Sequence, residues 1–150
     1  MTTAHPIANI KIQHNSQGNR EIFCPVRNKY VALTPEEWVR QNYLLYLHNT
    51  LSYPFELIQV EGKISLNGMT RRCDIVVYDT QVRPLIIIEC KKETVSLTQR
   101  VIDQASRYNI VLKVPYLCIT NGPQQICCQV DSANQALINI PSLPPYNKKS

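Results

Sequence analysis

Residues 71–93 read RRCDIVVYDTQVRPLIIIECKKE, and this stretch decides the fold. Two runs rich in Val and Ile are separated by a polar turn, which is typical of an antiparallel hairpin. The runs predict strands at about residues 72–78 and 85–90. Both strands carry charged residues at the ends far from the turn, although apolar runs of this kind belong in a protein core. The reason for those charges is the central question that the sequence raises.

The turn determines which charged residues face each other. If it is centred between Gln81 and Val82, Asp74 lies opposite Glu89, because the two positions are symmetric about that centre. Side chains alternate along a strand, so Lys91 projects from the same face as Glu89. Two carboxylates about 4 Å apart, at an effective dielectric constant near 20, repel by on the order of 4 kcal/mol. We therefore expect a cation at this point.

A divalent metal ion is one candidate for that cation. Asp74, Glu89 and the backbone carbonyl of Cys90 form a partial shell of oxygen atoms, which suits Mg²⁺ or Mn²⁺. Lys91 is then free to contact an anionic substrate or to orient water. The alternative interpretation is that the charges mark the points where the strands leave the core. The pattern alone leaves both interpretations open.

Two helices are predicted around this hairpin. In TPEE, Thr34 is the N-cap and Glu37 completes a capping box, so a helix is expected at residues 35–49. In SLTQ, Ser96 and Gln99 form a second capping box. Apolar residues at helical spacing then predict a helix over residues 96–112.

Further strands and irregular segments are predicted from turn residues and apolar runs. Gly62 is expected to mark a bulge in the strand that precedes the hairpin. The expected strands comprise two short segments within residues 20–33, and residues 55–66, 116–120 and 125–130. Irregular structure is expected in residues 1–19 and in the Pro-rich stretch 136–150.

Composition indicates one compact domain of the α/β (α+β) class. The chain has 150 residues, of which 44% are hydrophobic and 18% charged, so it can bury a sizeable core. Loose termini are expected at residues 1–19 and 142–150. The sequence shows neither a membrane-spanning run nor a signal peptide, which favours a cytoplasmic location. The excess of five basic residues favours a polyanionic partner.

The cysteines and histidines show no metal-binding spacing. We expect the six cysteines to be small buried hydrophobic residues, because the chain contains no CxxC motif and they lie in apolar runs. The histidines are expected to be ordinary surface or edge residues. The positions concerned are Cys24, Cys73, Cys90, Cys118, Cys127, Cys128, His5, His14 and His48.

Five segments together resemble the PD-(D/E)xK nuclease superfamily, and specifically the N-terminal nuclease domain of the type I restriction enzyme R subunit. In chain order they are TPEEWVRQ, RRCDIVVYD, PLIIIECKK, QASRYN and YLCITNG. The resemblance spans about residues 32–141 and implies that they form a restriction-endonuclease-like αβββαβ core, in which helices flank a mixed central sheet with an antiparallel meander. Cys73 stands where the family pattern has proline, a change that scarcely affects metal ligation.

The resemblance also implies a catalytic centre. Asp74, Glu89 and Lys91 would form it, Gln104 and Tyr108 would be the QxxxY element, and Glu37 would be the acid of the first helix. Gln104 and Tyr108 lie on one helix face and could reach the same phosphate. For Tyr108, packing of the helix against the sheet is an alternative.

The implied activity is Mg²⁺- or Mn²⁺-dependent hydrolysis of DNA phosphodiester bonds. Arg71, Arg72, Lys92, Arg107 and Tyr108 are the expected DNA contacts, although the basic residues could instead form a solvated rim. The chain lacks GxxxxGK[ST], so an ATP-driven motor, or a specificity subunit, is expected on another polypeptide. A homodimer is plausible, because one centre cuts one strand. The alternative function is a noncatalytic nucleic-acid-binding or assembly module that retains the nuclease fold.

Overall fold

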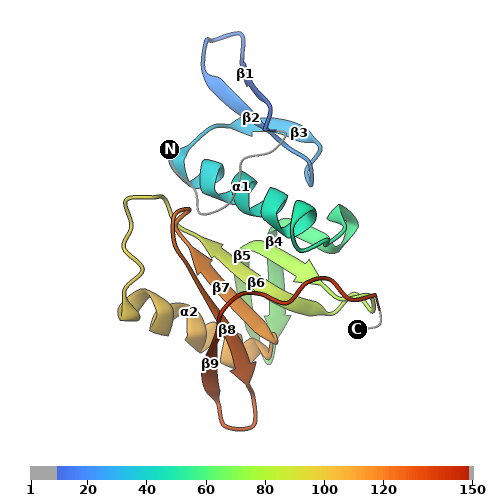
Figure 1. Cartoon of the computed structure of the whole chain (residues 1–150), viewed down its shortest axis with the longest axis vertical. Helices are drawn as coiled ribbons and strands as arrows, with labels where there is room; N and C mark the ends of the chain where they lie inside the picture. Colours follow the sequence, from blue (N-terminus) through green and yellow to red (C-terminus); the bar gives the residue numbers. More distant parts are fainter. Residues whose placement is uncertain (1–9, 149–150) are drawn as a thin grey trace.

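The computed structural model describes residues 10–148. The predictions for residues 1–9, including His5, and for residues 149–150 therefore lie outside the described residues. Within residues 10–148 the chain forms two α-helices, a three-stranded antiparallel sheet and a six-stranded mixed sheet (Figure 1). No helix in this range combines the length and apolar character that a membrane crossing requires.

The elements follow one another in an order close to the predicted one. They are β1 (Ile12–His14), β2 (Arg20–Cys24), β3 (Lys29–Ala32), α1 (Pro35–Asn49), a 3₁₀ turn (Phe55–Leu57), β4 (Ile58–Leu66), β5 (Met69–Tyr78), β6 (Pro84–Cys90), α2 (Gln99–Leu112), β7 (Tyr116–Thr120), β8 (Gln125–Asp131) and β9 (Ala136–Ile140).

The six-stranded sheet runs from β4 to β9 in chain order, and only β6 and β7 are parallel neighbours. Parallel neighbours need a crossover connection, and α2 provides it. In the β5–β6 hairpin, Ile75 pairs with Ile88 and Val77 with Ile86. Here the register is the predicted one, and its next position places Asp74 across from Glu89. Nearer the turn the register shifts by one residue between Val77 and Tyr78, so that Tyr78 pairs with Pro84, which was not predicted.

The two helices cover opposite faces of this sheet, and α1 also lies between it and the three-stranded sheet (Figure 1). On the face of α1, Tyr43 and Leu47 pack against Ile86 and Ile88. On the face of α2, Ala105 belongs to a second cluster, with Val76, Ile87, Leu117 and Ile119. All six cysteines are free and buried, as predicted.

The caps of both helices differ in part from the prediction. Thr34 caps α1, because its side chain accepts a hydrogen bond from the Glu37 N–H at 3.0 Å. The reciprocal half of that capping box is absent, since the Thr34 N–H donates to the Ala32 carbonyl instead. At α2, Thr98 is the N-cap and not Ser96, so the helix begins at residue 99.

Several predictions of irregular or extended structure were wrong. Residues 12–14 form β1 and residues 136–140 form β9, because each is paired with a longer neighbouring strand. Residues 55–57 form a 3₁₀ turn and not the start of β4. Gly62 does not mark a bulge, because the β4–β5 register is the same on both sides of it. The backbone irregularity lies one residue earlier, at Glu61, whose φ is 56°.

Candidate active site

Asp74 is held by both carboxylate oxygens, one through the β5–β6 hairpin and the other through α1. Oδ2 accepts a hydrogen bond of 2.8 Å from the backbone N–H of Cys90, on the neighbouring strand. Oδ1 accepts one of 3.3 Å from Nη2 of Arg40, on α1. Cys90 itself points into the core beside α1, as the alternation of the strand predicts.

The alternation of side chains is interrupted close to Asp74. Cys73 and Val76 both join the core cluster beside α2, whereas Ile75 lies in the cluster beside α1. Glu61, whose backbone has a left-handed conformation, is the residue of β4 that stands opposite Asp74 in the β4–β5 register. Asp74 can therefore meet a donor from α1 while it remains a neighbour of Glu89.

Glu89 is a buried acid with an unusual protonation equilibrium. The residue is 8% exposed, and burial raises the pKa of its carboxyl to about 7. The positive charges of Arg71 and Lys91 oppose this shift in the pKa, and the negative charge of Asp74 adds to it. The charges of Arg71, Asp74 and Lys91 therefore all act on the Glu89 carboxyl.

A cavity of about 380 Å³ opens over Glu89. Arg71 extends across it, with its Nη2 atom 2.7 Å from Oε1 of Glu89 and its guanidinium carbon 4.3 Å from the centre of the Tyr108 ring. The walls comprise Thr70, Arg71, Arg72, Glu89, Lys91, Val101, Gln104, Ala105, Tyr108 and Ile119. Basic and hydrogen-bonding groups thus surround one buried carboxylate.

The cavity brings together most of the predicted site residues. Gln104 and Tyr108 reach it from one face of α2, as their spacing predicts. Asp74 is not among the residues that line it, but its negative charge contributes to the raised pKa of Glu89, which does line it. The exposed residues Lys92 and Arg107 are not among those that line it.

The predicted acid of the first helix, Glu37, lies within a buried network on α1. Its carboxylate accepts hydrogen bonds from Arg27, Arg40 and Gln41, at 2.9 to 3.0 Å. The roles of Arg27 and Arg40 were not predicted from the sequence. A signal was present, because Glu37, Arg40 and Gln41 occupy positions i, i+3 and i+4 of a helix rich in apolar residues.

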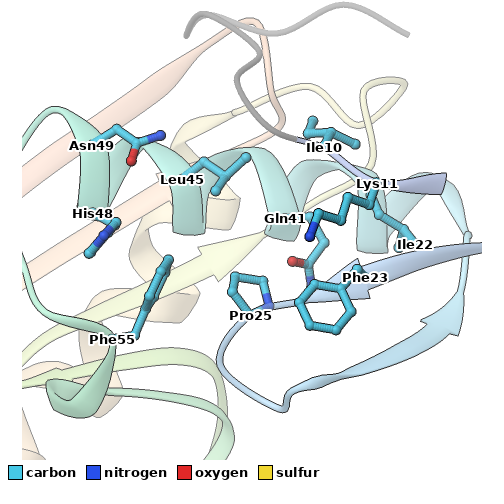
Figure 2. Close-up of a pocket in the computed structure, with 10 residues that line it drawn as sticks. All are labelled: Ile10, Lys11, Ile22, Phe23, Pro25, Gln41, Leu45, His48, Asn49 and Phe55. Atoms are coloured by element: carbon cyan, nitrogen blue, oxygen red, sulfur yellow. The ribbon is translucent and has the colours of Figure 1, made fainter.

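A second cavity, of about 270 Å³, lies between the three-stranded sheet and α1 (Figure 2). Phe23, Pro25, Leu45 and Phe55 give it a largely apolar wall, and none of the predicted site residues lines it. Gln41 connects the two regions, because it lines this cavity and donates a hydrogen bond to Glu37. The candidate active site is therefore the first cavity.

The residues at the first cavity fit a hard divalent cation. The buried Oε1 atom of Glu89 has no donor in hydrogen-bond geometry among the described residues, despite the nearby Arg71. Residues 10–148 contain no group of three His, Cys, Asp or Glu side chains that could hold a metal ion. A site here would thus consist of two carboxylates and the Cys90 carbonyl, with water completing the shell, as is common for Mg²⁺.

A family model described as "Type I restriction enzyme R protein N terminus (HSDR_N)" matches residues 35–144, from the start of α1 to beyond β9. No curated protein matches the chain.

Proposed function

Because the chain belongs to the family of type I restriction enzyme R protein N termini, we propose that it is a metal-dependent endonuclease that hydrolyses DNA phosphodiester bonds. The observation that carries this proposal is the pair Asp74 and Glu89, which the β5–β6 hairpin brings together beside a basic cavity. The order α1-β4-β5-β6-α2-β7 supports a restriction-endonuclease-like αβββαβ core.

Asp74, Glu89 and the Cys90 carbonyl would hold the Mg²⁺ or Mn²⁺ ion. When bound, such an ion polarises the scissile phosphate and offsets the charge that develops during in-line displacement. The raised pKa of Glu89 is consistent with this assignment, because burial disfavours its charged form and a bound cation would favour that form.

The remaining residues of the cavity suit a phosphate group. Lys91 brings an ammonium group to the same cavity as Glu89, where it would neutralise a phosphate oxygen. Arg71 and Arg72 would hold the DNA backbone without reading its sequence. Gln104 and Tyr108 would contact the same phosphate from α2.

The proposed setting is a cytoplasmic enzyme that acts on DNA and works with a motor or specificity subunit on a separate polypeptide. Cleavage of both strands would require a second copy of the chain or a second event at one site. A homodimer would satisfy this requirement.

Nicking of supercoiled plasmid with Mg²⁺ or Mn²⁺ tests the proposal. We expect Lys91→Ala to slow nicking by about 100-fold or more, the usual cost of losing a group that stabilises developing charge. Lys29→Ala is the matched control, because it removes an exposed lysine on β3 that does not line the cavity. Equal nicking by the parent and Lys91→Ala would remove this site from consideration.

A second measurement separates catalysis from binding. Asp74→Ala should weaken Mn²⁺ binding in a direct titration of the protein. If the parent binds DNA tightly and does not cleave it with either ion, the noncatalytic nucleic-acid-binding or assembly module becomes the better description.

A further inference from the structure

A chain of buried ion pairs links the three-stranded sheet to the candidate site. Arg27, in the turn between β2 and β3, binds both oxygens of Glu37 through Nη2 at 2.9 Å. Glu37 accepts a further bond of 2.9 Å from Nη1 of Arg40. Nη2 of Arg40 then donates to Oδ1 of Asp74. The series of ion pairs thus connects the β2–β3 turn, through α1, to β5.

The carboxylate of Glu37 is fully occupied by this arrangement. Oε1 accepts from Arg27 and Arg40, and Oε2 accepts from Arg27 and Gln41. An ionised carboxylate has about four lone-pair positions, and these four bonds use them all. Glu37 consequently has no oxygen site left for a metal ion or a substrate.

Arg40 is well suited to orient Asp74. Its side chain is 8% exposed, and Glu37 balances its charge at 2.9 Å. A planar guanidinium that is fixed by one carboxylate presents its other nitrogen in a defined direction. Arg40 therefore holds one oxygen of Asp74, while Cys90 holds the other.

We propose that Arg40 is a positioning residue for Asp74, and that Glu37 acts through Arg40 without touching metal or substrate. This inference rests on the proposed function, because it assumes that Asp74 is a ligand of the divalent ion. It also gives the three-stranded sheet a role, because Arg27, in the turn between β2 and β3, holds the Glu37 carboxylate that in turn holds Arg40.

Whether removal of Arg40 strengthens or weakens Mn²⁺ binding shows whether Arg40 acts through its charge or by orienting Asp74. Arg40 is a cation 3.3 Å from Asp74, so its charge alone weakens the binding of another cation. Its removal would then strengthen Mn²⁺ binding. If Arg40 orients the ligand, its removal weakens Mn²⁺ binding instead. Loss of a group that orients a metal ligand typically costs about 10- to 100-fold in affinity.

The experiment is a titration of the full chain with Mn²⁺ in the absence of DNA, followed by calorimetry and by the electron paramagnetic resonance signal of free Mn²⁺. We expect Arg40→Met to bind Mn²⁺ about 10-fold more weakly than the parent. Arg83→Met is the matched control, because Arg83 pairs with Asp79 at the hairpin turn, and its affinity should equal that of the parent.

A double-mutant cycle tests the role of Glu37. Glu37→Gln should weaken Mn²⁺ binding, and the double variant Glu37→Gln/Arg40→Met should bind no more weakly than Arg40→Met alone. Such non-additivity is expected when one residue acts through the other. Additive losses would show an independent contribution of Glu37 to the metal site and would overturn this part of the proposal.

Arg40→Lys keeps the inference falsifiable if Arg40→Met does not fold, which thermal unfolding of each variant will reveal. Lysine retains the charge but cannot bridge two carboxylates in the same geometry, so weaker Mn²⁺ binding is again expected. Equal or tighter binding by the folded Arg40 variants would overturn the positioning role, while plasmid nicking by the parent would leave the proposed function intact. A parent that neither binds Mn²⁺ nor nicks DNA would overturn both.

Discussion

Replacement of Glu89 by glutamine should change how the stability of the metal-free protein depends on pH. The carboxyl of Glu89 has a pKa of about 7 in the folded protein, against 4.5 for an ordinary glutamate. Between these pH values the folded state binds more protons than the unfolded state, so stability falls as pH rises. The stabilising contribution is fully present below pH 4.5 and is lost as pH passes about 7.

The size of the effect follows from this difference in pKa. At about 1.4 kcal/mol per pKa unit, the difference between 4.5 and about 7 predicts that the parent loses up to about 3.5 kcal/mol of unfolding free energy through Glu89 alone. Glu89→Gln cannot ionise, so it should avoid this loss. Any effect of the substitution on Arg71 itself is common to both ends of the interval and cancels in the comparison.

Urea unfolding at pH 5, 6, 7 and 8 with a chelator present measures the effect. The unfolding free energy of the parent should fall relative to that of Glu89→Gln, most steeply between pH 5 and pH 7. Glu56→Gln, which removes an exposed carboxylate, controls for the change in net charge. Parallel pH profiles for the parent and Glu89→Gln would refute the reasoning, because they would show that Glu89 ionises as readily in the folded as in the unfolded chain.

Other variants test separate parts of the structure. Arg71→Met should raise the affinity for Mn²⁺ in the absence of DNA by about 10-fold, because it removes a cation 2.7 Å from Oε1 of Glu89; calorimetry measures this, and weaker binding would contradict it. Val82→Gly should stabilise the protein by about 1 kcal/mol in urea unfolding, because Val82 is 71% exposed and holds a φ of 60° that costs a β-branched residue energy. Leu117→Ala should cost about 2–5 kcal/mol, because the side chain is fully buried in the sheet; a loss under about 1 kcal/mol would count against this core. Thr34→Ala should cost about 1 kcal/mol by removing the cap of α1, and Thr34→Ser should cost little.

The central part of the fold could be predicted because its signals are local. The two strands of the β5–β6 hairpin follow from their apolar runs, and α1 follows from Thr34 and Pro35 at its start; the shift in register between Val77 and Tyr78 was not predicted. By contrast, β1 and β9 have short sequences without a strong pattern of their own. They are strands because β2 and β8 offer them hydrogen bonds, and the sequence does not display such partners.

The site residues that could be predicted are those that lie on helices and strands with clear sequence patterns. Glu89 lies near the end of β6 and Lys91 is the first residue after it, two positions on, while Gln104 and Tyr108 share a face of α2, so their meeting at one cavity follows from simple periodicity. Arg40 lies 34 positions before Asp74, and its contact depends on how α1 packs on the sheet. No local sequence pattern indicates that Arg40 contacts Asp74. The proposal that Arg40 orients Asp74 therefore needed the structure.

The two arginines beside the acidic pair differ in a way that bears on how the site would accept its substrate. The Arg40 side chain is 8% exposed and pairs with both Glu37 and Asp74, so its departure would leave Glu37 with Arg27 as its close cation and Asp74 with only the Cys90 N–H among these donors. The Arg71 side chain is 17% exposed, its closest ion pair is the one with Glu89, and it stacks on the exposed ring of Tyr108 at the cavity. When a divalent ion binds Glu89, Arg71 can leave Glu89 and bind a DNA phosphate instead. The ion then supplies the positive charge beside Glu89 that Arg71 supplied before. We therefore expect DNA to strengthen Mn²⁺ binding in the parent and to do so much less in Arg71→Met, because coupling between two ligands requires an element that responds to both.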